Sequence, residues 1–570
     1  MTRKQQWRGA ALCVAIYLGC LLIAWPVAEM GYDDDWSYIR TAQVLAQTGH
    51  FIYTGWSNPI LGWQAIWGEL FIKLFGFSFT AVKLSTVPIA AVTIVLFHAI
   101  LLRFGITSRN SIIATLTLAL SPLFMPLSVS FMTDLYGLFI VVASLYLCKR
   151  ALDARATSGA MLWLCLATLT SLVGGTARQT GWLGALVLVP SCGWILRKRR
   201  TVLAASLALG AISLISVILC MAWMRHQPYW ASNDLLDTVT LGWAMRALLT
   251  LYELGGGTIS LLIIIVPVLV IWIPEIRQVS RQAKITYVYV VCLAALMQLI
   301  GRLPLPWVLH TMQLQFTSQR VSAFNPIVSQ SGFVELSIAF FTVIILAASS
   351  AVCLHALLRR WHHGGDSVIG KQLFWLCAPL TAAYVALLLP RALHALIFDR
   401  YMLLLAPIAI LCLAHLYQCS VSPKMPAGAI ALLVLMASIS VAGTHDIFAW
   451  QRARLAAIAE LTAAGVPPTS FYGGVECDGW TQIEHGGHIN SPWLTNPPDA
   501  YTPQPPVIKD DPCAHGFAPY VPSIHAEYTI VFEPKPCFEP SRFPSVSYIS
   551  WIPPFRRTIY VQRIPESRRR

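Results

Sequence analysis

The clearest pattern along this chain is a series of long apolar runs separated by short polar segments. Runs of about 17 to 25 apolar residues have the length with which a helix crosses a bilayer. We therefore predict an all-α polytopic membrane protein with about thirteen transmembrane helices. The expected spans lie near residues 9–28, 80–102, 110–128, 131–148, 158–176, 181–196, 201–223, 258–274, 285–300, 333–358, 372–390, 401–418 and 426–443.

The first external loop, residues 29–79, departs from this pattern because it is long and keeps apolar residues at helical spacing. Its segments 35–47 and 61–75 are predicted to form short helices that lie in the membrane interface, where tryptophan and amphipathic faces are favoured. Gly49 provides a stop signal for the first of them. We expect an aromatic belt on this side of the membrane from Trp36, Trp56, Trp63 and Trp67.

The chain beyond Thr444 differs again, because apolar residues become fewer and proline becomes common. A helical pattern over 450–464 is followed by runs typical of β-strands at 469–472, 528–532, 545–552 and 558–564. We therefore divide the chain into a transmembrane domain, residues 1–443, and a small soluble α/β domain, residues 444–570.

Composition agrees with a membrane protein and gives its orientation. Of the 570 residues, 56% are hydrophobic and 12% are charged, whereas soluble proteins carry about 25% charged residues. The net charge of +14 comes largely from basic clusters on alternate loops, so nucleic-acid binding is not needed to explain it. These clusters are Arg103/Arg109, Lys149/Arg150/Arg155, Arg197–Arg200, Arg277/Arg281/Lys284, Arg359/Arg360/Lys371 and Lys424.

Most of the 14 cysteines lie in apolar spans or near the basic face, where cysteine behaves as a small hydrophobic residue. Only Cys477, Cys513 and Cys537 belong to the C-terminal domain. If that domain lies outside the cell, two of the three can form a disulfide. The sequence leaves open which two.

Three consecutive carboxylates, Asp33, Asp34 and Asp35, follow the first span. Carboxylates are costly in hydrocarbon and weak as interface anchors, so this cluster indicates a site that faces water, a substrate or a cation. A single aspartate at a helix start is often only an N-cap. One carboxylate suffices for a cap, and the triple cluster therefore favours chemistry. For Asp134, capping of the next span is an equally good explanation.

Several basic residues lie on the side of the membrane where the positive-inside rule disfavours them. Arg178 and Arg400 are the clearest cases, and Arg391 and His394 share the external turn of Arg400. Snorkelling of a long side chain to the interface explains such residues equally well. Lys83, near the outer end of the second span, is a weaker candidate of the same kind.

A series of short motifs follows the same order as these candidate residues: Asp34-Asp35-Trp36-Ser37-Tyr38, Ala42, Ala46-Gln47-Thr48-Gly49, Asn58-Pro59, Leu74-Phe75-Gly76, Met132-Thr133-Asp134, Ala177-Arg178-Gln179 and Asp399-Arg400-Tyr401. In this order they resemble the GT-C glycosyltransferase superfamily, specifically bacterial relatives of the protein O-mannosyltransferases and the lipid A aminoarabinose transferase (family 39). The resemblance covers residues 10–420. The acidic pair of the first loop is usually Asp-Glu in that family, so Asp35 departs from the pattern.

The resemblance implies transfer of a sugar from a polyprenyl-phosphate donor to a protein, lipid or glycan acceptor, as in protein glycosylation and cell-envelope synthesis. Asp34 would be the general base, with Asp33, Asp35 and Asp134 as further catalytic candidates. The donor phosphate would bind to cations and their neighbours, here Arg400, Arg178, Arg391, Tyr401, Lys83 and His394. No metal is expected to be obligatory, and a divalent cation stays open as an alternative.

The main rival class is a secondary transporter or lipid flippase. Such proteins tend to show internal repeats, broken helices and ionisable residues near the bilayer midplane. Here the acidic residues and the unexplained arginines gather at one membrane face, which favours an enzyme working at the interface. The expected location is the bacterial inner (plasma) membrane.

The alternation of basic loops predicts that the N-terminus is cytoplasmic and that residues after Thr444 are periplasmic or extracellular. A reporter that is active only outside the cytoplasm should therefore work when fused after Ile447. A cytoplasmic signal from that fusion would reject both the orientation and an active site on the outer face.

Overall fold

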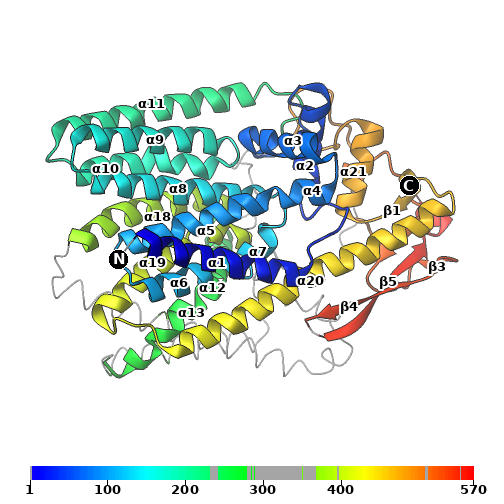
Figure 1. The fold of residues 1–570 in the computed structure, drawn as a ribbon. Helices are drawn as coiled ribbons and strands as arrows, with labels where there is room; N and C mark the ends of the chain where they lie inside the picture. Colours follow the sequence, from blue (N-terminus) through cyan, green and yellow to red (C-terminus); the bar gives the residue numbers. More distant parts are fainter. Residues whose placement is uncertain are drawn as a thin grey trace.

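The computed structural model describes residues 3–231, 242–278, 368–394, 397–506, 511, 513–552 and 554–569, with isolated positions between 281 and 350. Figure 1 shows a body of long helices and, at one end of it, a small unit of helices and strands. The N-terminus lies at the opposite end of the helical body. The expected fold class, a helical polytopic membrane protein with a small C-terminal α/β unit, is confirmed.

Within the described residues, seven helical segments are long and apolar enough to cross a membrane. The helix α11 (Arg200–Met224) shows why lipid must surround them, since it exposes Leu214, Ile218 and Leu219. A helix that exposes large apolar side chains in this way is stable only against an apolar solvent. The other spans are α1 (Arg3–Ala24), α4 (Phe79–Leu84) with α5 (Thr86–Arg103), α8 (Thr133–Asp153), α9 (Thr157–Gly175), α18 (Val368–His394) and α20 (Ala427–Ala463).

An eighth apolar crossing is bent. Its first part is Glu253–Ile264, within α12 (Trp243–Ile264). Its second part is Val266–Glu275, which includes α13 (Val266–Leu269) and part of η3 (Val270–Gln278). The two parts meet at an angle of 78°. Pro267 lies at the start of α13, and a proline cannot donate a backbone hydrogen bond to the preceding turn. The shorter apolar helix α19 (Ala406–Ser420) follows later in the chain.

Two expected spans are shorter in the structure. The run at 110–128 forms α6 (Ser108–Ala119) and the single turn α7 (Phe124–Leu127), with Pro122 in the break. The run at 181–196 forms η1 (Gln179–Trp182), η2 (Gly184–Leu188) and α10 (Val189–Ile195). The runs at 285–300 and 333–358 lie outside the described residues, apart from isolated positions. The number of thirteen spans thus stays a prediction.

The two helices expected in the first external loop are present as α2 (Asp35–Thr48) and α3 (Gly62–Phe75). Gly49 ends α2 with a φ of 72°, a left-handed conformation that glycine adopts at little cost. The expected aromatic belt is wrong for Trp36, whose side chain is 0% exposed. This ring is covered by the C-terminal domain, where a Cβ on Gly479 would lie 2.5 Å from it.

The C-terminal unit begins within a helix, because α20 runs without a break through the expected boundary at 443 and 444. The helix expected at 450–464 is the C-terminal part of α20. Each expected β-run holds a strand: β1 (Phe471–Tyr472), β2 (Tyr528–Val531), β4 (Val546–Trp551) and β5 (Pro554–Arg563). They form a sheet in the order β1-β2-β5-β3, where β3 is Glu539–Pro540, and β4 pairs with β5. The helix α21 (Val475–Gly486) follows β1.

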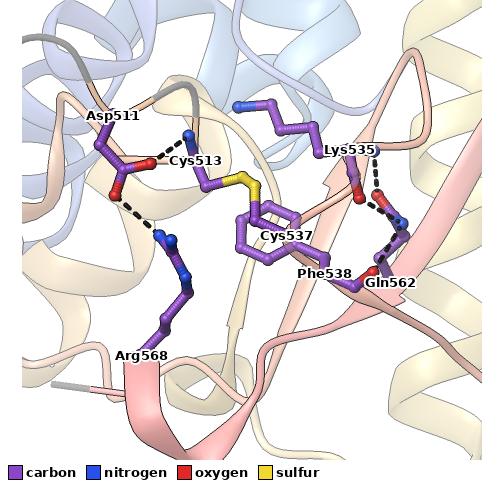
Figure 2. Close-up of a disulfide and its surroundings, with 7 residues drawn as sticks. All are labelled: Asp511, Cys513, Lys535, Cys537, Phe538, Gln562 and Arg568. Carbon is purple, nitrogen blue, oxygen red and sulfur yellow. Dashed lines mark hydrogen bonds and ion pairs between the residues drawn. A yellow bond between two sulfur atoms is a disulfide. The ribbon is translucent and has the colours of Figure 1, made fainter.

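A disulfide joins Cys513 to Cys537 in this unit (Figure 2). Asp511 lies beside it, where its carboxylate accepts a hydrogen bond from the backbone N–H of Cys513 and pairs with Arg568 at 2.7 Å. Cys477 is free, and burial raises the pKa of its thiol to about 12. The structure therefore decides the pairing that the sequence leaves open.

Removal of this disulfide should weaken the C-terminal unit. The bond closes a loop between positions 24 residues apart, and in the chain-entropy model such a closure contributes about 3 kcal/mol. We expect protease to digest this unit of the double variant Cys513→Ala/Cys537→Ala at a clearly lower temperature, or at a lower denaturant concentration, than in the wild type. Cys477→Ala is the matched control. Equal protease resistance of the double variant and the wild type would contradict the prediction.

Candidate active site

The acidic segment is held in place by hydrogen bonds to its backbone. Lys83 in α4 donates from Nζ to the carbonyl oxygens of Ala28 and Met30, at 2.9 and 2.7 Å. Gln451 in α20 donates to the carbonyl oxygen of Gly31 at 2.9 Å. The chain between α1 and α2 is therefore fixed from two sides just before the carboxylates.

Asp35 is the structural member of the acidic cluster. Its side chain is 0% exposed, and its two oxygens accept hydrogen bonds from the backbone N–H groups of Tyr32 (2.6 Å) and Phe131 (2.9 Å). It therefore connects the start of α2 to the turn that precedes α8. Because this carboxylate is fully buried as well as bound on both oxygens, a substrate cannot reach it to transfer a proton.

Asp33 and Asp34 point instead toward Arg400, at the start of η5 (Asp399–Leu404). Asp33 forms an ion pair with Nη1 of Arg400, and Asp34 approaches Nη2 at 3.2 Å. The other oxygen of Asp34 accepts a hydrogen bond from the indole of Trp56 at 2.9 Å. The two aspartate side chains are 26% and 27% exposed, against 5% for the arginine. Both carboxylates therefore remain partly accessible to solvent.

Asp134 completes the cluster from the first turn of α8. Its carboxylate lies 3.0 Å from Nη2 of Arg178 and 3.8 Å from Nε of Arg400. Arg178 also donates from Nη1 to the hydroxyl of Thr133 at 2.8 Å. The buried carboxylate thus stands between two guanidinium groups, as a buried charge requires.

Three arginine side chains of the site lie close to the ring of Tyr401. The guanidinium carbons of Arg391, Arg178 and Arg400 lie 4.9, 5.2 and 5.9 Å from its centre, within the range of cation–π attraction. Arg391 differs from the other two, because it forms no ion pair within the described part of the chain. It therefore has donors free for an anionic ligand.

Residues that the sequence did not single out support this arrangement. Glu253 in α12 accepts a hydrogen bond from the backbone N–H of Ile397 at 2.9 Å, just before Arg400. The hydroxyl of Tyr384 in α18 donates to the carbonyl oxygen of Tyr401 at 2.7 Å. Glu253 could have been found, since a carboxylate at the edge of an apolar run needs an internal partner. Tyr384 and Trp56 carry no comparable signal.

The electrostatic surroundings make Asp34 a stronger base than a solvated aspartate. Desolvation in the enclosed site, and next the charge of Asp33, raise its pKa to about 6. The pKa of Asp33 is also raised, chiefly by desolvation, although Arg400 opposes the shift. Asp34 is therefore ionised at neutral pH and takes up a proton more readily than usual.

The structure thus brings together seven of the ten residues expected at the site. Two others lie apart from this cluster: Asp35, which holds backbone N–H groups, and Lys83, whose ammonium is used by the carbonyls after α1. His394 ends α18, and its side chain lies outside the described part of the structure. The seven are Asp33, Asp34, Asp134, Arg178, Arg391, Arg400 and Tyr401.

A metal ion finds no ready set of ligands among the described residues, where no group of three or more His, Cys, Asp or Glu side chains is arranged to hold one. The carboxylates nearest to such a set, Asp33, Asp34 and Asp134, all face the guanidinium of Arg400. A cation bound between them would have to displace that group.

Comparison with known proteins gives matches only at the level of structure. No family model and no curated protein matches the chain. The oligosaccharyltransferase AglB from Archaeoglobus fulgidus, in complex with an inhibitory peptide and a dolichol-phosphate, is 14% identical with a TM-score of 0.39, over 78% of this chain and 55% of that one. ArnT from Cupriavidus metallidurans in the apo state is 14% identical with a TM-score of 0.40, over 81% and 83%.

The arabinosyltransferase EmbB from Mycobacterium smegmatis is also 14% identical, with a TM-score of 0.34, over 78% of this chain and 42% of that one. The match with the oligosaccharyltransferase covers about half of that protein's length. At TM-scores of 0.40 or less the likeness carries no argument about activity, so the function must be argued from the site itself.

Loss of Arg400 should destabilise the protein strongly. In Arg400→Ala the carboxylates of Asp33 and Asp34 lose the cation between them. Because both are partly exposed, we expect a loss near the lower end of the about 3–5 kcal/mol of unfolding free energy that an unpaired buried charge costs. Arg400→Lys should recover only part, because lysine lacks the planar fork. The loss should shrink below pH 6, where Asp34 takes up a proton. Denaturant unfolding in detergent measures the effect.

Arg391→Ala is the matched control for this measurement, since Arg391 lies on the same tyrosine ring without an ion pair among the described residues. Its removal should cost under about 1 kcal/mol. Equal losses in the two alanine variants would contradict the central role of Arg400.

Proposed function

We propose that this protein is a membrane glycosyltransferase, which transfers a sugar from a polyprenyl-phosphate donor to an acceptor at the outer face of the cytoplasmic membrane. The observation that carries this proposal is the pairing of accessible carboxylates with a group of arginines around one tyrosine ring. Transfer from a lipid-linked sugar phosphate requires both elements, a base for the acceptor and cations for the departing phosphate.

Asp34 is the proposed general base. The acceptor hydroxyl gives its proton to the carboxylate while the acceptor oxygen bonds to the anomeric carbon. The bond from that carbon to the phosphate oxygen breaks, and its electron pair leaves with the phosphate. The hydrogen bond from Trp56 orients Asp34 and leaves its second oxygen toward the arginine side of the site. A positioned base of this kind contributes about 10²–10⁴-fold to the rate.

Arg391 and Arg178 are the proposed ligands of the phosphate. Arg400 was the first choice from the sequence, but its three nitrogens face Asp33, Asp34 and Asp134. A phosphate reaching Arg400 would have to displace one carboxylate and lie beside the others. Arg391 avoids this repulsion, and its guanidinium shares the ring of Tyr401 with Arg178. The planar fork of arginine suits phosphate oxygens.

Arg400 then has a different task, which is to hold Asp33 and Asp34 at the site and to keep them ionised. Asp134 orients both Arg178 and Arg400. We leave the sugar open, and the acceptor is a protein, a lipid or a glycan with a free hydroxyl or amine. A divalent cation is not required by this scheme.

A transporter or lipid flippase remains the alternative. The bent crossing at α12 and α13 is a feature that such proteins share. In this chain the acidic residue at the start of that crossing, Glu253, binds the backbone before Arg400 and so supports the same site. The purified protein should decide between the classes when it is incubated with a panel of polyprenyl-phosphate sugars. Cleavage of a donor supports the enzyme, and movement of intact donor alone supports the transporter.

The base assignment predicts that Asp34→Asn lowers turnover by about two orders of magnitude or more while donor binding stays close to normal. For the wild type, kcat/KM should fall about tenfold per pH unit below pH 6, because protonation of Asp34 removes the base. Release of polyprenyl phosphate from a consumed donor measures both quantities.

Asp33→Asn is the matched control, since this carboxylate shares Arg400 with Asp34 but lacks the indole donor. Its turnover should fall less. A larger loss in Asp33→Asn than in Asp34→Asn would transfer the base to Asp33, and normal turnover in Asp34→Asn would reject the assignment.

The phosphate assignment predicts that Arg391→Ala weakens binding of undecaprenyl phosphate by roughly ten- to a hundredfold, the loss of one charge-assisted contact of about 1.5–3 kcal/mol. Arg391→Lys should restore only part of the affinity, because lysine cannot pair bidentately. If Arg391 only reaches the interface by snorkelling, lysine should restore binding fully.

Arg40→Ala is a suitable control, because Arg40 bonds Gln43 and stacks on Trp480 on the same side of the protein. It should bind the lipid phosphate normally. If Arg391→Ala binds undecaprenyl phosphate as tightly as the wild type, Arg178 and Arg400 would be the ligands of the phosphate instead.

A further inference from the structure

The hairpin formed by β4 and β5 has one face that is largely exposed, apart from a contact of Trp551 with α20. Ile549 pairs with Arg556 across the hairpin, and Trp551 pairs with Pro554 at its end. Directly opposed residues, and residues two apart on one strand, lie on the same face. Ile549 is 63% exposed and Trp551 is 39% exposed, and Arg556 beside them is exposed as well. The face therefore combines large apolar side chains with a cation.

The end of the hairpin is fastened to α20 close to the apolar part of that helix. The carboxylate of Asp446 accepts hydrogen bonds from the hydroxyl of Ser550 and from the backbone N–H groups of Trp551 and Ile552, all at 2.7 to 2.8 Å. The ring of His445 stacks on Trp551 with 3.8 Å between the ring centres. In Figure 1 the hairpin lies beside α20, and its turn is directed toward the apolar helices.

The level of this end relative to the membrane follows from α1. Arg452 donates from Nη1 to the carbonyl oxygens of Trp25 and Val27, the residues that follow the first span. Asp446 precedes Arg452 by six positions in α20, which is about 9 Å nearer to the apolar part of the helix. The side chain of Arg452 itself leans in that direction. The hairpin end therefore lies near the level at which α1 leaves the membrane.

A surface at this level is in contact with lipid headgroups. Tryptophan is favoured at that depth, aliphatic side chains reach the acyl boundary, and arginine pairs with phosphate groups. Trp25, 59% exposed at the end of α1, marks the same level from a second element. The exposed face of the hairpin thus has the composition that a membrane interface selects.

We propose that the face formed by Ile549, Trp551 and Arg556 docks on the membrane leaflet on the C-terminal side of the same bilayer that the chain spans. The hairpin then adds a direct contact with the membrane to the attachments that α20 and the loop between α1 and α3 already give the C-terminal unit. The proposal does not depend on the enzymatic activity. A second copy of the chain is the other occupant that the test has to exclude.

The test uses an environment-sensitive fluorophore attached to Ile549→Cys in the full-length protein. The exposed Cys165 and Cys419 are replaced by serine, and the same background without the new cysteine gives the signal to subtract. The protein is placed as a single copy in nanodiscs of phosphatidylcholine and phosphatidylglycerol. Phosphatidylcholine with a nitroxide near its headgroup should quench the label by about half or more.

Val475→Cys is the matched control, because Val475 is 41% exposed at the start of α21 and belongs to the same unit. Its label should not be quenched. Equal quenching at the two positions, or none at either, would overturn the proposal. Shielding of position 549 that appears only when two copies share a disc would assign the face to a second copy and would overturn it as well.

Discussion

The buried guanidinium of Arg400 is the interaction on which the site depends. It contacts carboxylates from two other segments, Asp33 and Asp34 after α1 and Asp134 at the start of α8. A buried cation is stable only with anions around it, and closely placed carboxylates are stable only with a cation between them. Each partner therefore makes the position of the others favourable, over 367 positions of sequence between Asp33 and Arg400.

The backbone around this ion pair is held by hydrogen bonds to buried side chains. The N–H groups of Phe131 and Ile397 bind the carboxylates of Asp35 and Glu253, and the hydroxyl of Tyr384 binds the carbonyl of Tyr401. Polar backbone groups at the edge of a membrane cannot rely on water and need partners inside the protein. These bonds connect the turn before α8, the segment before η5 and the helix α18 to the same region of the protein.

The C-terminal unit takes part in the same region and is more than an appended domain. Trp36 at the start of α2 is covered by α21, and the backbone N–H of Ile489 donates to the carbonyl of Thr54 at 2.8 Å. Trp56, which orients Asp34, makes edge contacts with Phe517 and Tyr520 of the C-terminal unit. The acidic loop is therefore positioned both by the apolar helices and by the C-terminal unit.

The sequence by itself determined the local features of this protein, because they depend on periodicity and composition within single segments. The apolar runs, the helices α2 and α3, the stop at Gly49 and the β-strands follow from such signals. One error was local, because Pro122 lies inside the expected span that it shortens. The other errors arose where distant segments decide, as for Trp36, which was expected at the membrane interface and is covered by α21. The three aspartates look alike in sequence, yet only tertiary contacts separate Asp35, which holds the backbone, from Asp33 and Asp34. Among the described residues, the same contacts pair Arg400 with carboxylates and leave Arg391 without an ion pair, since charges interact through space and not along the chain.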